Sequence, residues 1–189
     1  MDEQTWIEKI LTGDTQCFSC FVAKYRVMAF NIAYRILENR EEAEEAVQDS
    51  FVRAYRALPD FQFGSKFSTW FYRIVYNTSS LTAQRRQSSS AGYNDDACPE
   101  QITNDETDNA LAVLEREDRK EIVRIVLQKI PPDEALLLTL YYLEESSIED
   151  IHQITGLTPS NIKVKLFRGR KRFYEKLKSI MKHEIHSIV

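Results

Sequence analysis

The sequence predicts an all-α protein of two small helical domains joined by an acidic flexible linker. Glycine and proline are scarce, with five of each in a chain of 189 residues, and no series of alternating segments indicates strands. Apolar residues recur instead at helical spacing along most of the chain. Hydrophobic residues make up 43% of the sequence, which is sufficient for a buried core.

Three helices are expected in the N-terminal domain, which we assign to residues 1–86. Their predicted ranges are residues 14–37, residues 39–58, and a segment from Ser65 or Ser68 to about Arg86. Asn39 and Glu42 have the spacing of a capping box, so they mark the start of the second helix. Pro59 marks its end.

The linker is expected to span residues 87–110, which are rich in Ser and then in Asn and Asp. Such a segment cannot bury enough apolar area to offset the conformational entropy lost on ordering. The C-terminal domain, residues 111–189, is expected to contain four helices. The first two are predicted from about Leu111 to Ile130 and from Glu134 to Leu143.

The last two helices have the pattern of a helix-turn-helix unit over residues 145–172. Ser147 is suited to cap the first of them, and Gly156 is suited to the left-handed conformation of a tight turn. Thr158 then caps the second, and Pro159 takes its first position, where no backbone N–H is needed. In units of this kind the second helix enters the major groove of DNA.

The second helix of this unit is strongly basic. Between Thr158 and Lys182 there are nine Lys and Arg residues against one acid, Glu175. Short side chains near the helix start suit base edges, and the cations that follow suit phosphates. The DNA-contacting residues are therefore expected to be Ser160, Asn161 and Lys163 near the helix start, followed by Arg168, Arg170, Lys171 and Arg172. The alternative is a solvated cationic helix end, but this charge ratio favours DNA binding.

A second nucleic-acid surface is predicted from residues 61–77, an aromatic and basic segment without Asp or Glu. Aromatic rings stack on unpaired bases and cations follow the backbone, so this composition suits single-stranded nucleic acid. The residues expected in this role are Phe61, Phe63, Lys66, Arg73 and Asn77. The alternative for the aromatic residues is burial, which helical spacing predicts for Trp70, Ile74 and one of Phe67 or Phe71.

The sequence contains two other motifs, and no catalytic site is expected. Gln48 and Asp49 lie beside an apolar helix face and suggest a docking surface for another protein, with a solvated face as the alternative. Cys17 and Cys20 lie three residues apart on an apolar helix, where cysteine behaves as a small hydrophobic residue, so no metal site is expected. The sequence offers no phosphate-binding loop or nucleophile–base pair, and we expect no enzyme activity, cofactor or small-molecule substrate.

The protein is expected to be cytoplasmic. No apolar run approaches the roughly 20 residues of a membrane span. The first ten residues are acidic and mixed, unlike a signal peptide. Three cysteines without a plausible disulfide framework fit a reducing compartment.

Two segments have sequences distinctive enough to indicate a protein family: VQDSFVRAYRAL at residues 47–58 and FSTWFYRI at residues 67–74. Together with the acidic linker and the C-terminal helix-turn-helix pattern, they resemble bacterial RNA polymerase sigma factors of the extracytoplasmic-function (ECF) group. The resemblance covers nearly the whole chain except the linker. It implies a non-enzymatic factor that binds core RNA polymerase, recognises the −35 and −10 promoter elements and promotes DNA melting.

The resemblance also implies roles for individual residues. The surface that grips the polymerase clamp helices is matched by Glu45, Gln48 and Asp49. The pocket for a base flipped from the −10 element is matched by the loop from Phe61 to Lys66, and the helix that recognises and melts this element by Lys66, Arg73 and Asn77. The −35 recognition positions are matched by Lys163, Val164, Phe167 and Arg168. An anti-sigma factor, often membrane-bound, commonly sequesters such proteins, and Gly169 stands where the family favours Ala, at a cost of up to ~1 kcal/mol in helix propensity.

One alternative function is an ordinary helix-turn-helix repressor or activator that acts on duplex DNA, with the N-terminal helices as a dimerisation or sensor module. This alternative needs only the C-terminal basic helix and leaves the acid-free aromatic segment unexplained. A requirement for strand melting separates the two functions, because a repressor gains nothing from a pre-melted bubble.

Overall fold

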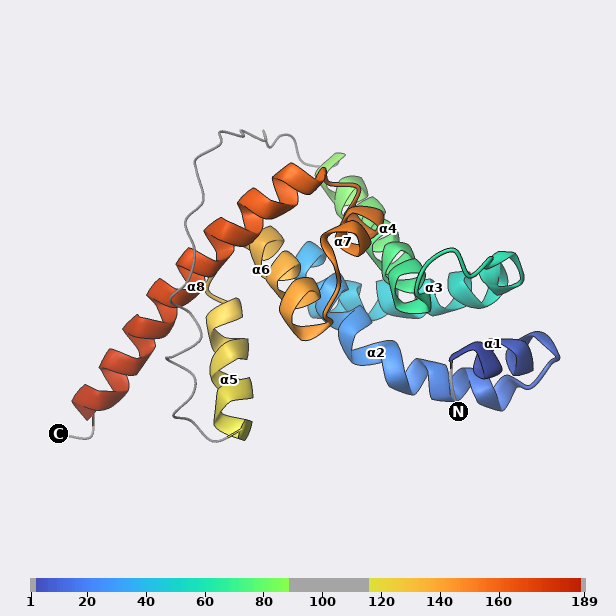
Figure 1. The fold of residues 1–189 in the computed structure, drawn as a ribbon, viewed down its shortest axis with the longest axis horizontal. Coiled ribbons are helices and arrows are strands. Elements are labelled where there is room, and N and C mark those ends of the chain that lie inside the picture. The colour runs from blue at the N-terminus through green and yellow to red at the C-terminus, as the bar shows by residue number, and fades with distance from the viewer. Residues whose placement is uncertain (1–2, 89–115, 188–189) are drawn as a thin grey trace. The chain divides into compact units, whose positions relative to one another are not determined.

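The computed structural model describes residues 3–88 and 116–187, and every regular element in these ranges is helical (Figure 1). Chain contacts divide these residues into two compact units. The first comprises residues 3–88 and 149–156, and the second comprises residues 116–148 and 157–187. Within the described ranges, no helix has both the length and the apolar character that a membrane span requires.

The first unit is built around three long helices that pack on one another. Its elements are α1 (Glu3–Leu11), α2 (Thr15–Leu37), α3 (Arg40–Ala57), the 3₁₀ turn η1 (Leu58–Asp60), α4 (Phe67–Ser88) and most of α7 (Ile148–Thr155). Helices α2, α3 and α4 confirm the three predicted helices to within two residues at most ends. Helix α1 was not predicted; it buries Ile7 and Ile10 against the start of α2.

An aromatic cluster forms the centre of the first unit. The Phe21 ring, from α2, meets the rings of Phe51, Phe67 and Phe71 with centroids 6.1, 4.4 and 5.5 Å away. Phe51 and Phe71 stack at 4.8 Å. All four side chains are buried, so α2, α3 and α4 are joined by shared apolar contacts.

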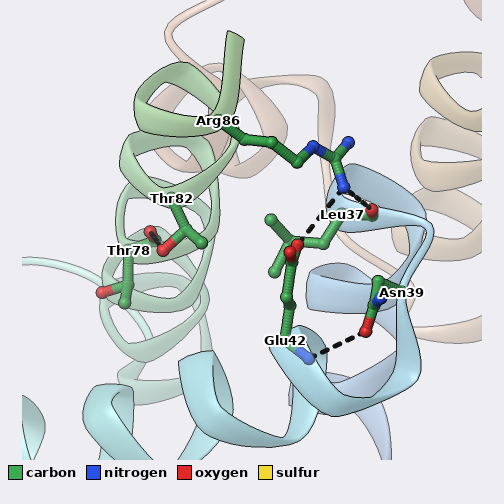
Figure 2. A network of polar contacts seen from close by, with 6 residues as sticks. All are labelled: Leu37, Asn39, Glu42, Thr78, Thr82 and Arg86. Carbon is green, nitrogen blue, oxygen red and sulfur yellow. Dashed lines mark hydrogen bonds and ion pairs between the residues drawn. The ribbon is translucent and has the colours of Figure 1, made fainter. Parts of the chain in front are cut away.

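Polar contacts fix the junction between α2 and α3 (Figure 2). The Asn39 side chain accepts the Glu42 backbone N–H at 3.1 Å, which confirms the predicted N-cap. Glu42 Oε2 lies 3.3 Å from Nη1 of Arg86, so this side chain is engaged by α4. The same Arg86 nitrogen donates to the Leu37 carbonyl at 3.0 Å, which satisfies an otherwise open group at the end of α2.

The second unit consists of α5 (Arg116–Leu127), α6 (Pro132–Leu138), the π-helical turn η2 (Thr139–Leu143) and α8 (Pro159–Ser187). Helix α5 packs on α8 through a cluster of Ile122, Val126, Phe173, Leu177 and Ile180. Helix α6 lies against α8 as well. The single helix predicted from Glu134 to Leu143 is instead an α-helix that widens into the π-helical turn.

The turn predicted between the last two helices has the expected local geometry. Gly156 adopts a φ of +74°, which a residue without Cβ tolerates. The Thr158 hydroxyl oxygen accepts the Asn161 backbone N–H at 3.3 Å, and Pro159 is the first residue of α8. The predicted turn and cap are therefore confirmed.

The predicted domain boundaries remain predictions. Most of the expected linker, and the expected helix start near Leu111, lie outside the described residues. Residues 149–156, expected in the C-terminal domain, group with the first unit.

Candidate nucleic-acid interface

Helix α8 has a buried side and an exposed side. Ile162, Leu166 and Gly169 are buried, and their spacing of three to four residues places them on one face. The candidate DNA-contacting residues divide by exposure. Those with exposed side chains are Ser160, Lys163 and Lys171; those that are half-buried are Asn161, Val164, Phe167, Arg168 and Arg170.

The π-helical turn η2 places an aromatic residue beside the basic helix. Tyr142 Oη lies 3.3 Å from Nη1 of Arg170. Tyr142 and its neighbour Leu143 are about half exposed, at 51% and 55%. The guanidinium of Arg170 is thus supported from outside its own helix, which sequence spacing did not indicate.

Two further cations of α8 contact α6 instead. Lys165 Nζ lies 2.5 Å from Asp133 Oδ2, and Arg172 Nη1 lies 2.6 Å from Glu134 Oε1. Burial alone would raise the pKa of Asp133, but the hydrogen bond and charge of Lys165 outweigh it, so the pKa lies below 3.8. For Glu134, burial outweighs the charge of Arg172 and raises the pKa above 4.5.

Gly169 marks a close approach of α6 to α8. A Cβ atom at this position would lie 3.2 Å from the Glu134 Cβ and 3.3 Å from the Leu138 Cγ. These are shorter than ordinary carbon–carbon contacts, so the glycine allows the two helices to meet. The helix-propensity cost expected from the sequence is offset by this packing.

The aromatic and basic segment of the first unit contributes both core and surface. Phe67 and Phe71 are both buried, although the sequence predicted only one of them in the core, and Trp70 and Ile74 are half-buried. Phe61 is also buried, at 8% exposure, with its ring centroid 5.1 Å from that of Trp70.

Phe63 is the one exposed aromatic residue of this segment, since the others are buried or half-buried. It is 52% exposed, and its φ of +55° is rare for a residue with a Cβ. Its ring touches that of Phe61 at 4.9 Å. The loop therefore presents one ring outward from an aromatic base.

The polar members of the segment lie on the surface of α4 and of the loop before it. Arg73 and Asn77 are exposed and four residues apart, so they share one helix face. Lys66 is also exposed, and its Nζ lies 3.8 Å from Asp150 of α7 within the first unit. Asp150 also accepts a 2.9 Å hydrogen bond from the buried Thr69 hydroxyl.

The predicted protein-docking residues Glu45, Gln48 and Asp49 are exposed on α3. Beside them, a surface groove of about 480 Å³ lies between side chains of α2 and α3, and Gln48 lines it. Helix α2 contributes Arg26 and Val27, which the sequence did not single out. The sequence signal for Val27 was an apolar residue that lies off the predicted core face of its helix. In the structure this side chain is 65% exposed.

Cys17 and Cys20 lie near the start of α2. Cys17 Sγ donates to Asp14 Oδ2 at 3.3 Å. The pKa of the Cys17 thiol is raised, mainly by burial and then by the hydrogen bond and charge of this carboxylate. Cys20 is exposed. Among the described residues, no group of three or more His, Cys, Asp or Glu side chains is placed to hold a metal ion.

Family models match both halves of the chain. The model of Sigma-70 region 2 matches residues 21–89, and that of Sigma-70 region 4 matches residues 120–173. The first range contains α3 and α4, and the second contains α6, α7 and the basic half of α8.

Known proteins are similar over almost the full length. The ECF RNA polymerase sigma-E factor of Haemophilus influenzae is 30% identical over 96% of this chain and 98% of its own. SigW of Bacillus subtilis is 30% identical over 92% and 96%, and the sigma-H factor of Pseudomonas aeruginosa is 29% identical over 95% and 96%.

Two solved structures share the fold. CnrH, in complex with the cytosolic domain of CnrY, has a TM-score of 0.60 at 19% identity and covers 94% of this chain and 97% of its own. RpoE of Bartonella quintana, in complex with the anti-sigma factor NepR, has a TM-score of 0.60 at 21% identity and covers 85% and 96%.

Proposed function

The chain belongs to the ECF group of RNA polymerase sigma factors, and we propose that it acts through two DNA surfaces and one polymerase surface. The observation that carries the proposal is the pair of separate exposed basic faces, one on α8 and one on α4 with its preceding loop. A factor that handles a promoter needs one surface for duplex DNA and another for the melted strand. The helix-turn-helix repressor is not favoured, because the matches extend over both halves of the chain.

The −35 element is bound as duplex by the exposed side of α8. Ser160 and Lys163 lie near the helix start, where side chains reach base edges in the major groove. Arg168, Arg170 and Lys171 follow at positions suited to phosphates. The buried side of α8, with Ile162 and Leu166, keeps this face turned outward.

The −10 element is held as a single strand by the first unit. Phe63 offers a solvent-exposed ring on which a base can stack, at about 1–3 kcal/mol per base. That energy is similar to the few kcal/mol that flipping a base requires. Arg73 and Asn77 on the neighbouring helix face contact the strand beside it, while Phe61, being buried, supports the loop.

Core RNA polymerase is bound through α3. Glu45, Gln48 and Asp49 form an exposed acidic and polar face, and the groove beside Gln48 adds apolar area. The protein has no catalytic role of its own and acts in the cytoplasm as a subunit of the polymerase. Because two solved relatives are bound to CnrY and to the anti-sigma factor NepR, an anti-sigma factor is a further partner of this chain.

Run-off transcription with core RNA polymerase tests the proposal. Promoter-dependent transcripts should appear only when the protein is added, and both Asn77→Ala and Arg168→Ala should reduce them strongly. Lys176→Ala, at an exposed position of the same long helix beyond the candidate contacts, is the matched control and should retain activity.

A pre-melted promoter separates the two DNA surfaces. Opening the −10 region in advance should restore much of the activity of Asn77→Ala and little of that of Arg168→Ala, because only the former acts on strand separation. Tight binding of intact duplex by the isolated protein, without stimulation of polymerase, would favour the repressor instead.

A further inference from the structure

Helix α8 carries cations on two different sides. Lys165, Gly169 and Arg172 are spaced by four and three residues, so they share one face. This face meets α6, since Gly169 is the point where a Cβ would lie 3.2 Å from Glu134. Lys163 and Lys171 are exposed at other positions of the helix.

Two carboxylates at the start of α6 form ion pairs with Lys165 and Arg172. Asp133 contacts Lys165 at 2.5 Å, and Glu134 contacts Arg172 at 2.6 Å. The Lys165 side chain is 23% exposed, that of Arg172 is 47% exposed, and that of Glu134 is 6% exposed. Glu134 Oε2 is buried and has no hydrogen-bond partner among the described residues, so Arg172 is the main compensation for this buried charge.

We propose that Asp133 and Glu134 hold Lys165 and Arg172 away from promoter DNA and so limit the number of phosphate contacts that α8 makes. The inference rests on the proposed function, because it requires α8 to be the helix that enters the −35 duplex. Each additional Lys or Arg on phosphate adds affinity for every DNA sequence alike. Withholding two cations therefore lowers the affinity for all DNA and leaves the base contacts unchanged, so that base contacts supply a larger share of the binding free energy.

The test is the salt dependence of DNA binding by the holoenzyme. Asp133→Asn releases Lys165 at a site whose carboxylate side chain is 53% exposed, so the fold is little disturbed. One more phosphate contact steepens the salt slope by about 0.9, so a fourfold rise in salt should weaken binding about 3.5-fold more than in the wild type. Affinity should rise by a similar factor for duplex with the −35 element and for duplex without it, because the added contact is to phosphate. Glu134→Gln should act in the same direction through Arg172.

Second-site changes separate this effect from a merely structural one. Lys165→Gln in the Asp133→Asn background removes the released cation and should restore the wild-type salt slope. Glu175→Gln removes one acid from α8 itself and is the control for net charge; it should leave the slope unchanged.

Three outcomes of these DNA-binding measurements lead to different conclusions about the inference and the proposed function. An unchanged slope in Asp133→Asn, with a wild-type holoenzyme that binds the promoter, would overturn this inference and leave the proposed function intact. A steeper slope that persists in the Asp133→Asn, Lys165→Gln variant would also overturn it, because the added contact would not come from Lys165. If the wild-type holoenzyme shows no preference for a −35 element, the proposed function fails and the inference fails with it.

Discussion

Replacing Phe71 by Ala should destabilise the first unit strongly. Phe71 is fully buried, and its ring contacts those of Phe51 at 4.8 Å and Phe21 at 5.5 Å, which belong to two other helices. Truncation of a buried Phe to Ala costs about 3–5 kcal/mol, since it removes apolar contacts and leaves a cavity. A unit of roughly 90 residues has about 4–13 kcal/mol of stability in total, so this loss is a large fraction of it.

Urea unfolding followed by tryptophan fluorescence measures this loss in the first unit alone. The protein has two Trp residues, Trp6 and Trp70, and both lie in that unit. Leu81→Ala is the matched control on the same helix; Leu81 is 47% exposed, and we expect a change within about 0.5 kcal/mol. A loss for Phe71→Ala below about 1 kcal/mol, or one equal to that of Leu81→Ala, would refute the assignment of this ring to the centre of the core.

Three smaller effects are expected. Asn39→Ala should cost about 1 kcal/mol in the fluorescence-detected unfolding, through loss of the cap on α3, and no measurable change would contradict that cap. Gly169→Ala should lower the stability of the second unit by up to about 2 kcal/mol, because crowding against Glu134 exceeds the gain in helix propensity; circular dichroism should detect this while the tryptophan transition stays in place. The lowered pKa of Asp133 stabilises the fold above pH 3.8, and this contribution is lost as the pH falls through the native pKa, so the stability difference between wild type and Asp133→Asn should shrink in acid. A difference that grows below pH 4 would contradict the Lys165 contact.

Sequence was sufficient where structure depends on neighbouring residues. The caps at Asn39 and Thr158, the left-handed Gly156 and the three helices of the first unit were all predicted, since each is decided within one or two helical turns. The basic character of α8 was likewise evident from composition alone. The candidate site could therefore be assigned to particular helices from the sequence alone.

Tertiary structure decided how side chains of the same kind divide between core and surface. Phe61 and Phe63 are two residues apart and equally apolar, yet one is buried and the other is 52% exposed, because the loop backbone turns at Phe63. Lys165 contacts a residue 32 positions away, and Arg172 one 38 positions away, so no local spacing indicated that either was paired. Gly169 appeared from the sequence to be a helix-weakening substitution, and only the proximity of α6 explains it. Helix periodicity depends on backbone geometry within a few residues, whereas burial and ion pairing depend on which other helix lies across the contact.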